Sequence, residues 1–452
     1  MKIISVFFTW LVFCLALPVT AQTQPGTGPI RFSLNEAKQY ALNNSPVLLN
    51  SARDVEIARK KLWENTATGL PQADLSSSYA YSPKLSGLTS VFTGGDTTGG
   101  GGGSPFGFSI NPEDLKTSFS MNIRVTQLIF SGQYIVGLKA AKVYASLSEL
   151  ANSKSVIGII ENITTTYFTL LIARESKDIL DSTLKTVQKT LFETEQLYAN
   201  GFAESTDVDQ LKILVSNIKS SLSVTERQIE LMDRLLKFQM GIPIDQAIVL
   251  TDQIDPLVTV MNFEAAVLDS FKLENNIDFQ MLTTQEKLMK LNMQVNMAQY
   301  LPTVAGFYNR YEDFDNNFFN DQSPNMFGLS LSFPLWTSGQ RNSQVSQSRL
   351  DYMKAQTNTR MASESLLIQY ETSLSEFLSA RDIYVMQKEN RNLALHIYEK
   401  SLKKFTEGIG SSLDLNQTQS QYFEAEGSYF NALMSLVSAK SKLESLLAKS
   451  AN

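Results

Sequence analysis

Four segments of the chain alternate apolar and polar residues, with the period of two that is typical of β-strands with one apolar face. The apolar positions of the second segment are Phe119, Met121, Ile123 and Val125. In the third segment the best apolar set is Ala305, Phe307 and Tyr311, one residue out of step with the first half of the chain, so its register stays open. The pattern predicts strands at about 72–82, 117–128, 303–312 and 326–335.

After each pair of strands the apolar spacing lengthens to that of an α-helix. Two of these helical stretches hold no proline over a length that corresponds to roughly 100 Å of helix. They end at Gly201 and Gly408, and the hydroxyls of Ser205 and Ser412 suit the N-caps of helices that return. The pattern predicts two hairpins, with long helices at 133–199 and 340–406 and return helices at 205–239 and 412–448.

The two halves of the chain repeat one order of motifs. Leu70-Pro71 recurs 231 residues later as Leu301-Pro302, and Ser131-Gly132-Gln133 recurs 207 residues later as Ser338-Gly339-Gln340. The difference falls in Ser82–Pro112, where five consecutive glycines predict an exposed, flexible loop. We expect a first repeat at 22–241, an equatorial linker at 242–262 and a second repeat at 263–452, each repeat beginning with a helix.

The first 21 residues predict a secretory signal peptide. Lys2 precedes an apolar stretch at 3–17, and small residues follow at Val19 and Ala21. Cys14 is the only cysteine and lies inside this stretch. We therefore expect an exported mature chain with no disulfide and no thiolate site.

The strand pattern fits the wall of a transmembrane β-barrel, with apolar residues facing lipid and polar residues facing the lumen. The aromatic residues Phe130 and Trp336 close the second and fourth strands and suit the membrane interface. Four strands cannot close a barrel, because the smallest membrane barrels have about eight. Several copies of the chain would have to share one barrel, whereas the alternative is a small soluble sheet packed on the helices.

Composition and charge argue against most other functions. The net charge of -6, without a lysine or arginine cluster, argues against a nucleic-acid partner. His396 is the only histidine, and no phosphate-binding glycine loop lies between a strand and a helix. We expect no enzyme activity, no cofactor and no metal site, although scattered carboxylates leave a hydrolase conceivable.

The duplicated order of Leu-Pro, paired strands, Ser-Gly-Gln, long helix, glycine turn and Ser-x-Asp resembles the TolC family of outer-membrane efflux proteins. In both halves 69 residues separate the glycine of Ser-Gly-Gln from the glycine of the turn, Gly132 from Gly201 and Gly339 from Gly408. The resemblance implies a mainly α fold with membrane β-structure. It further implies a homotrimer, in which a twelve-stranded β-barrel in outer-membrane lipid continues into a twelve-helix α-barrel across the periplasm.

The same resemblance implies a function and partners. We expect a passive exit duct for small molecules in a tripartite efflux pump, with a periplasmic adaptor protein and an inner-membrane pump of the resistance-nodulation-division or ABC type. The outer-membrane component of a type I protein secretion system is an alternative, and a coiled-coil structural protein of the cell surface is another. Neighbouring genes would distinguish efflux from secretion.

The resemblance also assigns roles to residues at the two turns. It implies a pore constriction at Asp414, Gln417 and Phe405, where Phe405 replaces a hydrogen-bonding tyrosine of the family and Gln417 replaces an acidic residue. Asp207 and Asp414 each stand in the first turn of a helix, where the dipole alone favours an acid by roughly 0.3–1 kcal/mol. The residues expected at the periplasmic tip and in adaptor docking are Gly201, Phe202, Ala203, Ser205, Thr206, Asp207, Gly408, Ile409, Gly410 and Ser412.

Overall fold

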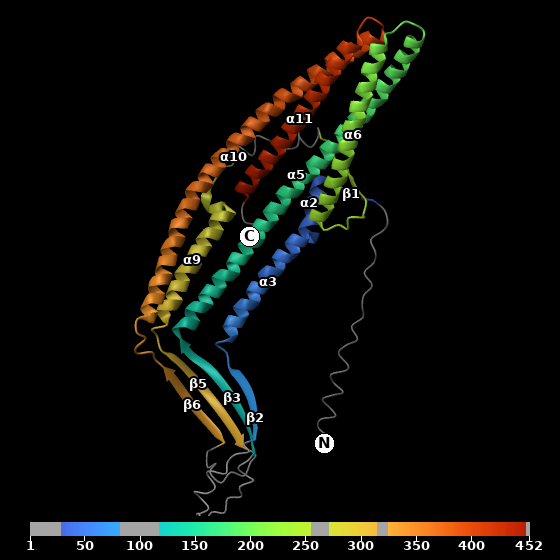
Figure 1. Cartoon of the computed structure of the whole chain (residues 1–452). Coiled ribbons are helices and arrows are strands. Elements are labelled where there is room, and N and C mark those ends of the chain that lie inside the picture. Colours follow the sequence, from blue (N-terminus) through green and yellow to red (C-terminus); the bar gives the residue numbers. More distant parts are fainter. Residues whose placement is uncertain (1–28, 82–116, 255–270, 314–323, 449–452) are drawn as a thin grey trace, which may run out of the picture.

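The computed structural model describes residues 29–81, 117–254, 271–313 and 324–448. The predicted signal peptide, the predicted Ser82–Pro112 loop and residues 255–262 of the predicted linker lie outside the described residues. The molecule is long and curved, with a β-sheet at one end and the turns of two helical hairpins at the other (Figure 1).

The sheet has four strands in the order β2-β3-β5-β6, and each neighbouring pair is antiparallel. The strands are β2 (Gln72–Tyr81), β3 (Thr117–Ser131), β5 (Thr303–Asp313) and β6 (Asn325–Ser332). Strand β6 ends three residues before its predicted end, because Pro334 has no N–H to donate to a ladder. Strands β2 and β6 are the two edges of this sheet.

The register of β5 contradicts the predicted apolar set Ala305, Phe307 and Tyr311. Phe307 lies opposite Thr126 of β3, and Tyr311 lies opposite Asn122. Residues directly opposite share one face of a sheet, so the predicted set lies on the polar face. Gly328 of β6 makes room for the Phe307 ring there, since a Cβ at Gly328 would lie 2.5 Å from it.

The apolar face of β5 carries Tyr308, which lies opposite Val125 and Phe327. The rings of Tyr308 and Phe327 pack with their centroids 4.7 Å apart. A β-bulge between Leu128 and Phe130 adds one residue to β3, and Phe130 therefore lies opposite Val304 on this same face. Trp336 follows β6 and is 86% exposed.

The helices form two hairpins, each with a shorter helix beside its long arm (Figure 1). In the first half of the chain they are α2 (Leu34–Asn44), α3 (Pro46–Ala67), α5 (Gly132–Ala199) and α6 (Ser205–Met240). In the second half they are the 3-10 turn η1 (Leu273–Asn275) and the helices α9 (Ile277–Ala298), α10 (Gln340–Thr406) and α11 (Ser412–Leu447). Two short strands, β1 (Ile30–Phe32) and β4 (Ile248–Leu250), pair in parallel beside α2.

Buried residues of both hairpins form two apolar clusters along the helices. The first, here called the central core, includes Ile163, Phe168, Leu236, Phe377 and Leu433. The apolar stretch at 156–173 of α5 supplies much of it, although α5 is long and apolar enough by composition to cross a membrane. The second cluster, here called the tip core, consists of Leu180, Val187, Leu211, Leu214, Val215, Ile218, Tyr398, Leu415 and Tyr422.

The repeated Leu-Pro and Ser-Gly-Gln motifs lie where the sheet meets the helices. A Cβ at Gly132 would lie 2.4 Å from Cδ1 and 3.2 Å from Cβ of Leu301, so the start of α5 closely approaches the other half of the chain. The Gln127 amide donates to the backbone oxygen of Gly69 over 2.7 Å. The Tyr134 hydroxyl donates to the oxygen of Thr66 over 3.1 Å.

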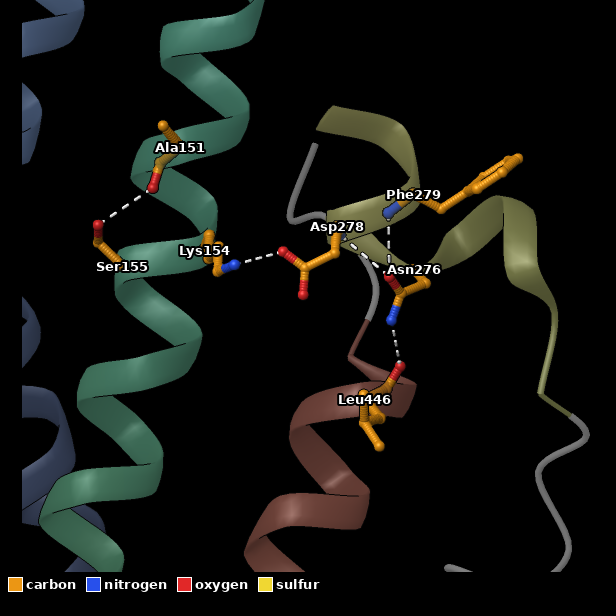
Figure 2. Close-up of polar contacts among 7 residues, drawn as sticks. All are labelled: Ala151, Lys154, Ser155, Asn276, Asp278, Phe279 and Leu446. Carbon is orange, nitrogen blue, oxygen red and sulfur yellow. Dashed lines mark hydrogen bonds and ion pairs between the residues drawn. The ribbon is translucent and has the colours of Figure 1, made fainter. Parts of the chain in front are cut away.

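A second junction joins α9, α11 and the middle of α5 (Figure 2). The side-chain oxygen of Asn276 caps α9 by accepting from the N–H groups of Asp278 and Phe279, at 3.0 and 3.1 Å. Its amide nitrogen donates 3.1 Å to the oxygen of Leu446, near the end of α11. Asn276 is only 2% exposed, whereas the side chains of the nearby ion pair, Lys154 and Asp278, are 55% and 36% exposed.

We expect Asn276→Ala to lower the free energy of unfolding by about 2 kcal/mol, because it removes a helix cap and leaves a helix-end carbonyl without its donor. Lys154→Met is the control, since an exposed ion pair contributes at most about 1 kcal/mol. Loss of helical circular dichroism on heating measures both variants. Equal effects would show that Asn276 does not hold the junction.

Candidate functional site

The turns of the two hairpins lie at the same end of the molecule (Figure 1). Gly201 and Gly408 have φ angles of 81° and 77°, in the left-handed region that favours glycine. The N–H that follows each glycine reaches back to a helix-end carbonyl, from Phe202 to Leu197 over 2.8 Å and from Ile409 to Lys404 over 3.0 Å. The side chains of Phe202 and Ile409 project from the turns and are 81% and 73% exposed.

The first tip is organised by Asp207. Glu204 is the N-cap of α6, and its N–H donates to Asp207 Oδ2 over 3.3 Å. The hydroxyl of Thr206 donates to the Glu204 carboxylate over 3.1 Å. The prediction that Ser205 is the N-cap is wrong, because Ser205 is already the first residue of the helix.

The second tip is organised by Asp414. Ser411 caps α11 by accepting from the Asp414 N–H over 3.1 Å. The carboxylate of Asp414 accepts from the hydroxyl of Ser401, a buried residue of α10, over 2.8 Å. The exposed Asp414 therefore ties the start of one helix to the end of its partner. No sequence pattern pointed to Ser401, because its partner follows only after the turn.

Ser412 has a different role from the predicted N-cap, and that prediction is wrong as well. It is the first residue of α11, and its side chain points to the other hairpin. The Ser412 hydroxyl donates to Asp207 Oδ1 and lies 3.0 Å from Oε1 of Gln210. A hydrogen bond from Ser412 to Asp207 therefore joins the turns of the two hairpins. Gln417 is exposed and, within the part of the chain that the structure describes, makes no comparable contact with its side chain.

Phe405 and Gly410 pack together at the base of the second turn. Phe405 is half-buried against the tip core. A Cβ at Gly410 would lie 2.9 Å from the backbone nitrogen of Phe405 and 3.1 Å from the carbonyl carbon of Lys404. Glycine is therefore required here by close packing, because any side chain would force the turn to shift.

Charged residues separate the tip core from the central core in the second hairpin. Arg391 of α10 donates to Glu426 of α11 over 2.9 Å, and both are largely buried. Beside them the rings of Tyr398 and Tyr422 stack with centroids 5.7 Å apart. Burial raises the pKa of Tyr398 to about 12, and burial together with the Glu426 carboxylate raises the pKa of Tyr422. Both phenols therefore stay neutral at physiological pH.

Within the described ranges, no group of three or more histidine, cysteine, aspartate or glutamate side chains is placed to hold a metal ion. The family model for outer membrane efflux proteins matches residues 38–230 and 270–449. The chain belongs to this family. Membership confirms the resemblance to the TolC family and the expected location in the outer membrane, and family and fold are those of channel proteins.

Individual relatives are distant. The chain is similar to the probable efflux pump outer membrane protein TtgC of Pseudomonas putida, with 24% identity over 298 residues, which are 64% of this chain and 60% of that protein. It is also similar to the outer membrane protein TolC of Escherichia coli, with 22% identity over 451 residues, 92% of this chain and 82% of that one. The match thus spans less than two thirds of the length of TtgC.

Solved structures share the fold. The CmeC outer membrane channel of Campylobacter jejuni has a TM-score of 0.72 at 16% identity, over 93% of this chain and 87% of that chain. The outer membrane protein VceC of Vibrio cholerae has a TM-score of 0.68 at 16% identity, over 92% and 96% of the two chains. At these identities the likeness establishes the fold alone.

We expect Gly410→Ala to destabilise the protein by about 1–3 kcal/mol, because the added methyl group meets backbone atoms that cannot move away independently. Gly427→Ala is a matched control in α11, where a Cβ would meet nothing within 4 Å. This control is expected to be neutral or to stabilise by up to about 1 kcal/mol, from helix propensity. Thermal unfolding of both variants measures the difference, and a stable Gly410→Ala protein would show that the turn has room for a side chain.

Proposed function

We propose that this protein is the outer-membrane channel subunit of a tripartite efflux pump and forms a passive exit duct for small molecules. The observation that carries the proposal is a four-stranded sheet with two unpaired edges, β2 and β6, at the end of two very long helical hairpins. In a single copy the strand edges lack hydrogen-bond partners and apolar surfaces of the helices are exposed. Several copies that close into a tube would pair these edges and cover these surfaces.

The strand edges support a shared barrel. Each edge presents a row of backbone N–H and C=O groups, which a bilayer core cannot hydrogen-bond. Pairing β2 of one copy with β6 of the next removes every edge. Three copies provide twelve strands, which is within the range of membrane barrels, whereas one copy falls short of the minimum of about eight.

The two faces of the sheet support this arrangement. One face carries apolar residues in register, such as Leu75 opposite Ile123 and Val304 opposite Leu331. On β5 this face also carries an ion pair, formed by Arg310, which lies opposite Ile123, and Glu312, which lies opposite Met121. We infer that this face contacts outer-membrane lipid.

The other face carries hydroxylated and amide side chains, together with the aromatic rings of Phe307 and Tyr311 on β5. Ser78 and Ser120 lie opposite each other with their hydroxyl oxygens 2.8 Å apart, and Ser76 lies opposite Asn122. Ser330 continues this face on β6. We infer that it lines a water-filled lumen.

The helices support a second, helical part of the duct. Helices α5 and α10 have 68 and 67 residues and so reach roughly 100 Å, far beyond the thickness of a bilayer. Exposed apolar residues follow their length and that of α6, among them Ile213, Leu231, Phe238, Met361 and Ile368. Neighbouring copies in a twelve-helix barrel would cover such residues.

We propose that the hairpin tips dock a periplasmic adaptor, which links the duct to an inner-membrane pump. Phe202 and Ile409 are large, apolar and exposed at the turns, as contact residues for a partner are expected to be. The names of TtgC and CmeC describe an efflux pump component and an outer membrane channel, which is the class of assembly proposed here.

The function is tested by reconstitution and by deletion. The purified full-length protein should conduct ions across a planar bilayer, and deletion of its gene should sensitise the bacterium to toxic small molecules. The wild-type gene should restore resistance. A protein that does not conduct, together with unchanged susceptibility after deletion, would refute the proposal.

We propose that Asp414, repeated three times, forms a negative ring at the pore constriction together with Gln417 and Phe405. Asp414→Asn should lower the cation preference and the block by divalent ions, because it removes the charge while its side-chain oxygen still accepts from Ser401. Reversal potentials in planar bilayers measure the preference. Ser401→Ala is the control, since it removes the hydrogen bond and keeps the charge. If only Ser401→Ala changed selectivity, Asp414 would serve the helix and not the pore.

A further inference from the structure

Two aromatic side chains of β5 lie on the polar face of the sheet, although the sequence predicted them on its apolar face. Phe307 lies opposite Thr126 and Gly328, and Tyr311 lies opposite Asn122. We propose that these two rings are stacking sites for planar aromatic small molecules that pass through the duct. The proposal rests on the proposed function, because it takes this face as the wall of the lumen.

The two rings differ in kind from the side chains around them. The neighbouring positions of this face include Ser76, Ser120 and Asn122, whose side chains are short and polar. Among the described residues of the four strands, this face carries no other aromatic ring. Apolar ring surface in water is unfavourable until another apolar group covers it. A partner from the lumen would provide that cover.

Phe307 has a structural partner on one side of its ring. A Cβ at Gly328 would lie 2.5 Å from Cζ and 2.7 Å from Cε1 of this ring. A ring placed over a glycine at a sheet edge covers backbone that no side chain protects. The Phe307 side chain is nevertheless only half-buried, so the rest of the ring remains open to the lumen.

Tyr311 is the more open of the two rings. Its neighbour across the ladder on β3 is the amide of Asn122, and the described register with β6 ends one residue earlier, at Arg310. The Tyr311 side chain is 38% exposed. Tyrosine combines an apolar ring with a hydroxyl that can hydrogen-bond, which suits contact with a partly polar molecule.

The spacing of the rings makes them two separate sites. Phe307 and Tyr311 are four residues apart on one strand, which corresponds to roughly 14 Å. A small aromatic molecule cannot stack on both at once, so it would contact them in turn. Phe307 lies nearer the start of β5, which follows α9, and Tyr311 lies nearer the other end. Three copies would repeat this pair around the lumen.

The surroundings of the rings favour aromatic molecules that also carry a polar group. Asn309 lies between the two rings on the same face, opposite the exposed Arg124. Both side chains can hydrogen-bond a polar substituent while the aromatic part stacks on a ring. Stacking tolerates many structures, because every aromatic molecule presents a π-face. Separate, weak sites also allow release, which conduction requires.

Two amines of equal charge test the stacking directly. The probe 1-naphthylmethylammonium is aromatic, and its fully hydrogenated decalin analogue has the same carbon skeleton without a π-system. In single-channel recordings of the full-length protein in planar bilayers, each probe should interrupt the current briefly. We expect the interruptions by the aromatic probe to last about two- to tenfold longer, as an aromatic pair contributes beyond its buried area. A charged constriction elsewhere in the duct would affect both probes equally.

The same strand provides a matched control. Combining Phe307→Leu with Tyr311→Leu removes both rings and keeps apolar side chains, so the preference for the aromatic probe should disappear. Tyr311→Phe keeps the ring and should retain the preference. Tyr308→Leu removes a ring from the opposite face of β5, where Tyr308 packs on Phe327, and should also retain it.

The recordings distinguish the stacking sites from the function as a duct. Equal interruptions by both probes in the wild-type channel would overturn the proposal, and so would a preference that survives loss of both rings. An equal loss in Tyr308→Leu would also overturn it. If the double variant does not assemble, Tyr311→Leu alone replaces it, and an unchanged preference in that variant would overturn the proposal. A wild-type protein that never conducts would instead refute the proposed function.

Discussion

The need to satisfy backbone hydrogen bonds at the edges of the sheet governs the rest of this structure. Among the described residues, strands β2 and β6 each leave one side without a partner, and the sheet has an apolar face whose exposure to water is unfavourable. A bilayer makes the requirement absolute, because it offers no substitute donors or acceptors. In the proposed assembly, the long hairpins attached to this sheet continue the ring that the strands form.

Much of the fold could be predicted from the sequence, because its signals are local. The change of apolar period marks the strands and helices, and glycines mark the turns. The register of β5 could not be predicted, since it depends on a bulge at Ile129 and on Gly328 accommodating the ring of Phe307 from the neighbouring strand. Both are contacts between segments that are distant in sequence.

In the candidate site, too, the sequence predicted the local features but not the contacts between distant segments. Gly201 and Gly408 have the left-handed backbone expected of turn glycines, and Asp414 stands in the first turn of α11 as the spacing indicated. Each cap lies one residue before the predicted position. Glu204 caps α6, whereas at α11 the neighbouring Ser411 is the cap and the Ser412 hydroxyl faces the other hairpin. Ser401 could not be identified for a related reason, since nothing beside it in the sequence indicates a carboxylate partner.

The proposed account therefore has two levels, the assembly of copies through their strands and the contacts between hairpins at the far end. In the proposed assembly, closure of the strands sets how many copies come together, and at the far end a hydrogen bond from Ser412 to Asp207 joins the two hairpins. The most direct test of the first level is the mass of the particle extracted in detergent, measured by light scattering with the detergent subtracted. A shared barrel predicts three copies of the mature chain, and a uniform monomer that retains native β-structure would contradict it.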